Sequence, residues 1–378
     1  MDRTELDNLI KSAMAGNTKA QIDLGIAFSQ GNGLRQDYVE AAKWFRKAAE
    51  QGSVAGQFNL GMCYDRGIGV PQNFAEAAKW YFYAAKQGNK IGQFNLGCFY
   101  ESGRGVAQNF SEAAKWYREA AQQGHVTAQL YIGNLYFEGK GVPQSNTEAA
   151  KWYLQAAHNG NAQAQYNIAI MYAQGTGVTE NPVEAVKWYR KAAEQGHQQA
   201  QYNLGTMYDE GIGCAQNFAE AAKWYKIAAE SGHEMAQYNL AEMYAAGQGV
   251  MRSDAESLKW LRLSANHGCA SAQYNLGVCY QNGWRGLKQD FAEAISWYKK
   301  AANQGYAPAQ HNLGCCYLWG QGTPANEAEA KKWEAYRVAR VKASANDYIR
   351  EIQELAAAGK DPFLLEELQL WYQSLLPY

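Results

Sequence analysis

The feature that most constrains this chain is a tryptophan that returns at a nearly constant interval. The series runs from Trp44 to Trp260 in steps of 36 residues, and continues with steps of 37 and 36 residues to Trp297 and Trp333. Thirteen residues before most of these tryptophans stands the first glycine of a Gly-x-Gly motif. Nine copies at one spacing predict a repeat array, in which each unit buries apolar side chains mainly against its sequence neighbours.

Within one repeat, the pattern predicts two helices separated by a glycine turn. In the second repeat, Leu60 and Cys63 fall on one side of a helical wheel. Gly67 then breaks the helix, because glycine enters left-handed backbone freely. The next helix begins at Asn73, and Glu76 stands three residues later at the spacing of a capping box. An equivalent pair occurs in all nine repeats, so the sequence predicts nine helix pairs.

The predicted second helix is apolar over a wide face. In the second repeat, Phe74, Ala78, Tyr81 and Ala85 lie on that face, with Trp80 on its flank. Such a face exceeds what one partner helix covers, so the helix is expected to contact both its own first helix and a helix of the next repeat. Antiparallel helix pairs packed in this way stack into an all-α fold, an α-solenoid.

The combined pattern resembles the Sel-one-like repeat (SLR), a relative of the tetratricopeptide repeat, over about residues 20–340. Residues 201–205 (Gln-Tyr-Asn-Leu-Gly) and 221–225 (Ala-Ala-Lys-Trp-Tyr) match it almost residue for residue, whereas Ala169 and Ala241 replace the glycine after the Leu position. The resemblance implies a right-handed superhelix whose first helices line the concave side and serve as a protein-binding scaffold.

The two ends of the chain depart from the repeat, and both are predicted to cap the array. We expect an N-terminal capping helix in residues 1–19, nine repeats in residues 20–340 and C-terminal capping helices in residues 341–378, because terminal repeats need a cover for their exposed apolar face. An alternative keeps the C-terminal segment for a partner or for dimerisation, since it is rich in leucine.

Composition excludes several classes of protein. The formal net charge of −1 argues against a nucleic-acid binder, and no apolar run approaches the roughly 20 residues of a membrane span. The start of the chain lacks a signal-peptide core, and the seven cysteines are odd in number and mostly far apart. We therefore expect a cytoplasmic protein without membrane insertion, with export as the alternative. The oligomeric state stays open, with a monomer favoured.

No constellation of residues indicates catalysis, a metal or a cofactor. His125, His197 and His233 occupy one slot in different repeats, so they lie at least one repeat apart, roughly 10 Å by helix packing. Zinc needs its nitrogen ligands at about 2.0–2.1 Å, which excludes a shared ion. The Gly-x-Gly turns follow a predicted helix, whereas a dinucleotide fingerprint follows a strand. We find no nucleophile with a base and an orienting group, and predict a non-enzyme.

The outward side of the first helices carries the candidate binding residues. Its leading slot is mostly aromatic, an asparagine usually follows it, and the slots one and two turns later vary in chemistry. A constant stripe beside variable positions is typical of a peptide groove. The predicted partner-binding residues are Phe58, Asn59, Met62, Asp65, Phe94, Asn95, Glu101, Tyr166, Asn167, Tyr202, Asn203, Asp209, Tyr238, Asn239, Glu242, Tyr274 and Asn275.

Two interpretations of this stripe stay open. The aromatic rings either wall a groove or pack against the neighbouring first helix, and the asparagines either bind a peptide backbone or tie helices to loops. In the first interpretation, the chain is a non-catalytic scaffold that holds a protein or peptide segment in its concave groove, and the acidic residues favour a segment with some Lys or Arg. The alternatives are an exported or host-directed bacterial virulence factor on the same scaffold and a hydrolase or small-ligand binder.

Overall fold

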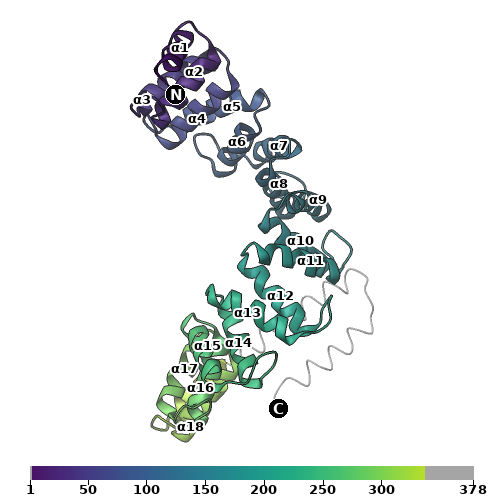
Figure 1. The fold of residues 1–378 in the computed structure, drawn as a ribbon. Helices are drawn as coiled ribbons and strands as arrows, with labels where there is room; N and C mark the ends of the chain where they lie inside the picture. Colours follow the sequence, from purple (N-terminus) through teal and green to yellow (C-terminus); the bar gives the residue numbers. More distant parts are fainter. Residues whose placement is uncertain (1, 337–378) are drawn as a thin grey trace. The chain divides into compact units, whose positions relative to one another are not determined.

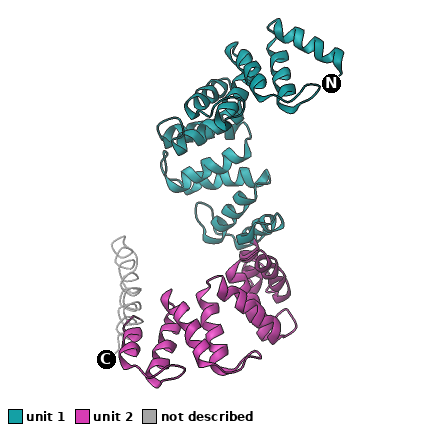
Figure 2. Ribbon diagram, turned by 90° about the vertical axis from the view of Figure 1, so that its left-hand side faces the viewer, with its two compact units in different colours: residues 1–200 teal, residues 201–378 magenta. Residues whose placement is uncertain are grey.

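A computed structural model describes residues 2–336, and within that range all regular structure is α-helical (Figure 1). The helices divide into two compact units, residues 1–200 and 201–378, with the boundary inside one helix (Figure 2). Within each unit, helices that follow one another in sequence pack against one another. The prediction of an α-solenoid built from helix pairs is confirmed.

Each of the first eight repeats contributes a first helix and a second helix of equal length. The first helices are α2 (Thr18–Gln30), α4 (Val54–Arg66), α6 (Lys90–Ser102), α8 (Val126–Glu138), α10 (Ala162–Gln174), α12 (Gln198–Glu210), α14 (Glu234–Ala246), α16 (Ala270–Asn282) and α18 (Ala307–Trp319). The second helices are α3 (Tyr38–Glu50), α5 (Phe74–Lys86), α7 (Phe110–Gln122), α9 (Asn146–His158), α11 (Pro182–Glu194), α13 (Phe218–Glu230), α15 (Asp254–Asn266) and α17 (Phe291–Asn303), and residues 327–336 are helical in the ninth repeat.

The two ends of the chain differ in what the structure describes. A single helix, α1 (Arg3–Met14), precedes the first repeat and packs on α2, where its Ala13 is buried with Ala20 and Leu24. At the other end, the capping helices predicted for residues 341–378 fall outside the described residues.

The helix starts follow the predicted caps, but only one half of the capping box forms in the repeats. The side chain of Asn73 accepts a hydrogen bond from the backbone N–H of Glu76, at 3.1 Å. Among the described residues, the reciprocal bond forms in α1, where Glu5 accepts from the backbone N–H of Asp2. In most second helices, the glutamate pairs instead with a lysine three residues later, as in Glu148–Lys151.

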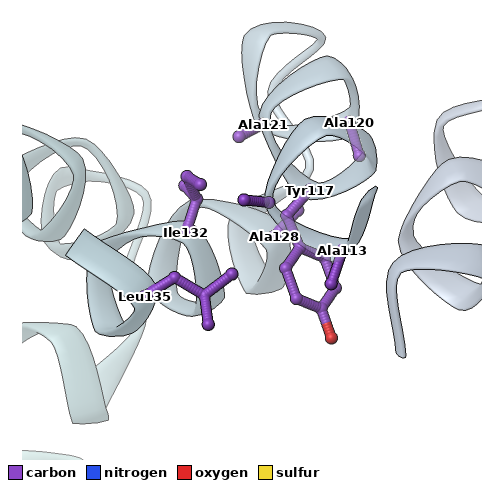
Figure 3. Packing of buried hydrophobic residues seen from close by; sticks show 8 residues of the cluster. Ala113, Tyr117, Ala120, Ala121, Ala128, Ile132 and Leu135 are labelled. Carbon is purple, nitrogen blue, oxygen red and sulfur yellow. The ribbon is translucent and has the colours of Figure 1, made fainter. Parts of the chain in front are cut away.

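The core lies between the two helices of each pair and between successive pairs. Figure 3 shows one cluster, in which α7 contributes Tyr117 and several alanines and α8 contributes Ile132 and Leu135. The alanines let the two backbones approach, and the tyrosine ring fills the space between helix turns. Tyr117 and Ile132 are fully buried, which confirms the predicted core faces of both helices.

Close packing requires glycine at two positions of the third repeat. A Cβ built on Gly97 of α6 would lie 2.5 Å from the ring of Tyr117. Gly105, the second glycine of the turn, has φ +68°, and a Cβ there would overlap the carbonyl of Phe74 in the preceding repeat. The turn therefore rests directly on the start of the preceding second helix, which fixes the spacing between repeats.

A ladder of buried glutamines also joins successive repeats. The Nε2 of Gln129 donates to the carbonyl of Ala121 at 3.2 Å, and its Oε1 accepts from Asn159 at 3.3 Å. Gln93 and Gln165 make the same pair of bonds, with Gln123 and Gln195 as donors to their side-chain oxygens. Each glutamine thus ties the last turn of the preceding second helix to the end of its own second helix.

Candidate partner-binding face

All the predicted binding residues lie on first helices, and every one of them is half-buried. Those numbered up to Asn167 belong to α4, α6 and α10 in the first unit, and those from Tyr202 onward to α12, α14 and α16 in the second. Within each unit, the structure therefore brings them to one side of successive first helices, which we call the first-helix face.

The aromatic side chains of the leading slot take part in packing. Phe94 stacks on His125, the N-cap residue of α8, with ring centroids 4.6 Å apart, and tilts against Tyr117 at 5.7 Å. Tyr202 and His233 repeat the stack at 4.5 Å in the second unit. These contacts support the neighbouring helices, as the packing interpretation predicts, while the half-buried rings keep part of their surface exposed and their role in binding stays a prediction.

The stacked histidines are helix caps. The Nδ1 of His125 accepts from the backbone N–H of Ala128 at 3.2 Å, and the Nδ1 of His233 accepts from Ala236 at 3.3 Å. Burial lowers the pKa of both imidazoles, which favours the neutral ring that this acceptor role needs. The sequence placed these residues in a common slot without indicating this role.

The asparagines join the repeats through tyrosine hydroxyls. The hydroxyl of Tyr117, on α7, donates to Glu101 of α6 at 2.5 Å, and that of Tyr81, on α5, donates to Asp65 of α4 at 3.3 Å. Asn95, on the next first helix, also hydrogen-bonds the Tyr81 hydroxyl. Tyr81 therefore bridges α4 and α6, the first helices of two successive repeats, which gives Asn95 a structural role.

Burial keeps these tyrosines neutral. It raises the pKa of Tyr81, Tyr117 and Tyr225 well above the usual range, and the negative charges of the neighbouring carboxylates add to the effect. A neutral hydroxyl donates a hydrogen bond, so each carboxylate on the face already holds one internal donor. Burial likewise raises the pKa of Tyr238 to about 12.

Two of the predicted acidic residues are also paired with arginine. Arg104, in the turn of the third repeat, binds Asp65 at 2.9 Å. Arg285, in the turn that carries the one-residue insertion, binds both oxygens of Glu242 at 3.0 Å. The two arginines come from equivalent turns and cross to the preceding first helix. The acidic charge of the face is therefore partly neutralised by the chain itself.

Within residues 2–336, no group of three or more His, Cys, Asp or Glu side chains is placed to hold a metal ion. No helix in that same range combines the length and the apolar character needed to cross a bilayer. The described face is therefore built from aromatic rings, amides, carboxylates and small apolar side chains on rigid helices. Such a surface can bind by shape, apolar contact and hydrogen bonding.

Comparison with known proteins places the chain among repeat scaffolds. The chain is 35% identical to a protective antigen present in uropathogenic Escherichia coli strains, whose crystal structure displays an SLR fold, with a TM-score of 0.77 over 88% of this chain and 79% of that one. It is 33% identical to a Sel1 repeat protein from Oxalobacter formigenes, with a TM-score of 0.66 over 82% of this chain and 89% of that one. Among curated proteins, no match was found.

The family model for the Sel1 repeat matches nine times in succession. The matched residues are 18–53, 54–89, 90–125, 126–161, 162–197, 198–233, 234–269, 270–306 and 307–333. Each match holds one first helix, its glycine turn and one second helix. Repeat scaffolds of this kind typically serve protein–protein interaction. The chain belongs to the Sel1 repeat family.

Proposed function

We propose that this chain is a non-catalytic scaffold that binds a segment of a partner protein along its first-helix face. The observation that carries the proposal is the contrast between the two sides of each first helix. Toward the second helices, Leu96 and Gly97 are buried in a packing that repeats along the chain. Toward the face, Phe137 and Leu318 occupy a slot that holds Asp65 and Glu101 in other repeats. Variation on a rigid scaffold is typical of a recognition surface.

The sequence analysis predicted a partner segment with some Lys or Arg, and only some of the acidic residues on the face are available for it. Asp65 and Glu242 are paired with arginines of the chain, whereas the side chains of Glu101 and Asp209 accept hydrogen bonds from tyrosine hydroxyls. A carboxylate that accepts one hydroxyl retains further acceptor positions. A Lys or Arg of the partner is therefore proposed to meet the face at Glu101 or Asp209.

The test compares two double variants whose positions are equally exposed. Phe137→Arg with Leu318→Arg changes the first-helix face at side chains that are 44% and 50% exposed. Tyr83→Arg with Val183→Arg changes second helices at side chains that are 42% and 52% exposed. Both add the same charge at the surface, so both are expected to fold with little change in thermal stability.

The immobilised full chain and both variants are exposed to lysate from the native host, and captured proteins are quantified by mass spectrometry. We expect a specific partner to be retained by the wild type and by the second-helix variant, and to be lost from the first-helix variant. A partner lost from the second-helix variant and kept by the first-helix variant would contradict the proposed face.

A second candidate role is that of an exported or host-directed protein. It is favoured by the likeness to a relative described as a protective antigen of uropathogenic Escherichia coli, at 35% identity. The same scaffold would then meet its partner outside the cytoplasm. Fractionation of the native host distinguishes the two roles, because a cytoplasmic adaptor remains with the cytoplasm and an exported protein is recovered in the medium or on the cell surface.

A further inference from the structure

An apolar cavity opens on the first-helix face between the first and second repeats. It has a volume of about 320 Å³ and lies between α2 and α4, with α3 beneath it. Its walls include Ile26 of α2, Tyr38 of α3, Met62 of α4 and Ile68 of the following turn. This volume lies at the lower end of the roughly 300–1,000 Å³ typical of ligand pockets.

The equivalent place one repeat later is filled by the chain. There the Tyr81 hydroxyl donates to Asp65, and Arg104 reaches from the turn to the same carboxylate at 2.9 Å. The guanidinium also lies over the ring of Phe74, 4.3 Å from its centroid. A tyrosine hydroxyl, a carboxylate and a long cationic side chain together occupy the space between α4 and α6.

All three of these groups are missing at the cavity. Counting back 36 residues, Phe45 stands in place of the tyrosine, Ser29 in place of the aspartate and Ile68 in place of the arginine. Phe45 brings the ring without the hydroxyl, and Ser29 turns its own hydroxyl back to the carbonyl of Ile26 at 2.8 Å. Each of the three differences removes a polar or charged group, and together they account for the open apolar space at this junction.

The rim of the cavity keeps apolar surface in contact with solvent. Ile26 is 36% exposed, Ile68 is 37% exposed and Tyr38 is 44% exposed. Grouped apolar side chains around a concavity on an otherwise polar surface are typical of a site that buries a side chain of another molecule. The cavity is continuous with the first-helix face, because Asn59 and Met62 belong to both.

Two polar groups at the cavity have no partner within residues 2–336. Asn95, which corresponds to Asn59, hydrogen-bonds a tyrosine hydroxyl, whereas Asn59 lines the cavity with Phe45, which has no hydroxyl, and makes no hydrogen bond to another described side chain. Arg66 lines the same cavity and forms no ion pair or hydrogen bond in that range. The site therefore offers an amide and an unpaired cation beside an apolar space.

We propose that this cavity receives one bulky aliphatic or aromatic side chain of a partner segment that carries an aspartate or glutamate next to it. The apolar side chain lies against Ile26, Met62 and Ile68, the Asn59 amide hydrogen-bonds the backbone of the segment, and Arg66 binds the acidic side chain. This inference rests on the proposed function, because it names the anchor by which the first-helix face selects a segment.

The experiment uses a random-peptide phage library selected on the full chain, followed by measurement of Kd for the enriched peptides by fluorescence anisotropy. Ile68→Arg, alone and combined with Ser29→Asp and Phe45→Tyr, copies into the cavity the groups found one repeat later. Ile212→Arg is the matched control, because Ile212 occupies the same turn position in the sixth repeat and is 43% exposed. Melting curves verify that all variants fold.

The expected result is enrichment of peptides with a bulky apolar residue beside Asp or Glu. Their Kd rises about tenfold or more with Ile68→Arg and with the triple variant, and is unchanged with Ile212→Arg. Arg66→Gln weakens binding less, and its effect shrinks as salt is added.

Other results overturn the inference in distinguishable ways. Some peptides could fail to bind the Phe137→Arg and Leu318→Arg variant and still bind the Ile68→Arg variant with unchanged Kd. That result would leave the proposed function intact and show that the cavity takes no part in it. Enriched peptides without an apolar–acidic pair would do the same. If the Kd of the peptides is changed neither by the Phe137→Arg and Leu318→Arg variant nor by the cavity variants, the proposed function is contradicted as well.

Discussion

The side of each first helix that meets the second helices and the side that forms the first-helix face differ in how strictly they repeat. On the buried side, Gln93 recurs as Gln129 and Gln165 with the same two hydrogen bonds. On the face, Ile26 is followed at the same slot by Met62, Cys98 and Asn134. Residues that hold neighbouring repeats together admit little change, whereas the face is free to acquire binding properties.

The largest expected effect is loss of a buried tryptophan. Trp188 is 5% exposed and lies edge-on to His158, with ring centroids 5.0 Å apart. Trp188→Ala is therefore expected to lower the free energy of unfolding by about 3–5 kcal/mol. Urea titration followed by circular dichroism measures the loss. Trp319→Ala, at a side chain that is 65% exposed, is the control, and equal losses in both variants would contradict the assigned core.

Removal of one rung of the glutamine ladder comes next. Gln129→Leu leaves the Ala121 carbonyl and the Asn159 amide without their bonds, and is expected to cost about 1–3 kcal/mol of unfolding free energy. The neighbouring exposed Gln122→Leu serves as the control in the same titration. A Gln129→Leu chain as stable as the control would show that packing alone joins these repeats.

A smaller effect tests the contact between glycine and tyrosine. Gly97→Ala gains helix propensity but overlaps the Tyr117 ring, so a net loss of about 1 kcal/mol is expected. In a Tyr117→Leu background, the same change is expected to stabilise the protein, since the seventh repeat pairs Ala241 with Leu261. A double-mutant cycle in urea measures the coupling. Additive effects would contradict a direct steric conflict.

Sequence variation among the repeats at the contact between glycine and tyrosine also indicates a steric conflict. The fifth repeat has alanine, Ala169, where others have glycine, yet it retains Tyr189. The Tyr189 ring is inclined by 53° to the Tyr166 ring, whereas the angle between the equivalent rings Phe94 and Tyr117 is 36°. A methyl group at this slot is therefore accommodated by turning the tyrosine.

The smallest effect is a dependence of stability on pH. Burial lowers the pKa of His125, so the folded protein binds a proton less readily than the unfolded chain does. Its stabilising contribution is present above the unfolded pKa of about 6.5 and is lost as the pH falls through the lowered folded value. His125→Asn keeps a cap of the kind seen at Asn89 and removes this titration. If the melting temperature falls equally in the wild type and in His125→Asn between pH 7 and pH 5, this role of His125 is contradicted.

Much of the fold was predictable because its signals are local. The cap at Asn73, the break at Gly67 and the apolar spacing around Leu60 each lie within a few residues of the structure they determine. The predicted capping box forms only in part, since Glu148 and most of its equivalents have a lysine within reach and pair with it instead. The predicted domain boundaries and the C-terminal caps stay predictions.

The binding site was less predictable because it depends on contacts between repeats. Spacing alone shows that Asp65 and Tyr81 are 16 residues apart, but not that they meet or that Asn95 joins them from the next helix. The cavity depends on Ser29, Phe45 and Ile68 together. Comparing each with the residue 36 positions later would have revealed the three differences, but only the structure shows that they converge.

Photo-crosslinking of a selected peptide tests most directly whether the first-helix face is the binding surface. The peptide carries a photoreactive aromatic residue at its apolar position, and crosslinked residues of the full chain are identified by mass spectrometry. We expect crosslinks at the first-helix face, foremost at Ile26, Met62 and Ile68. Crosslinks confined to outward positions of second helices, such as Tyr83 and Val183, would contradict it.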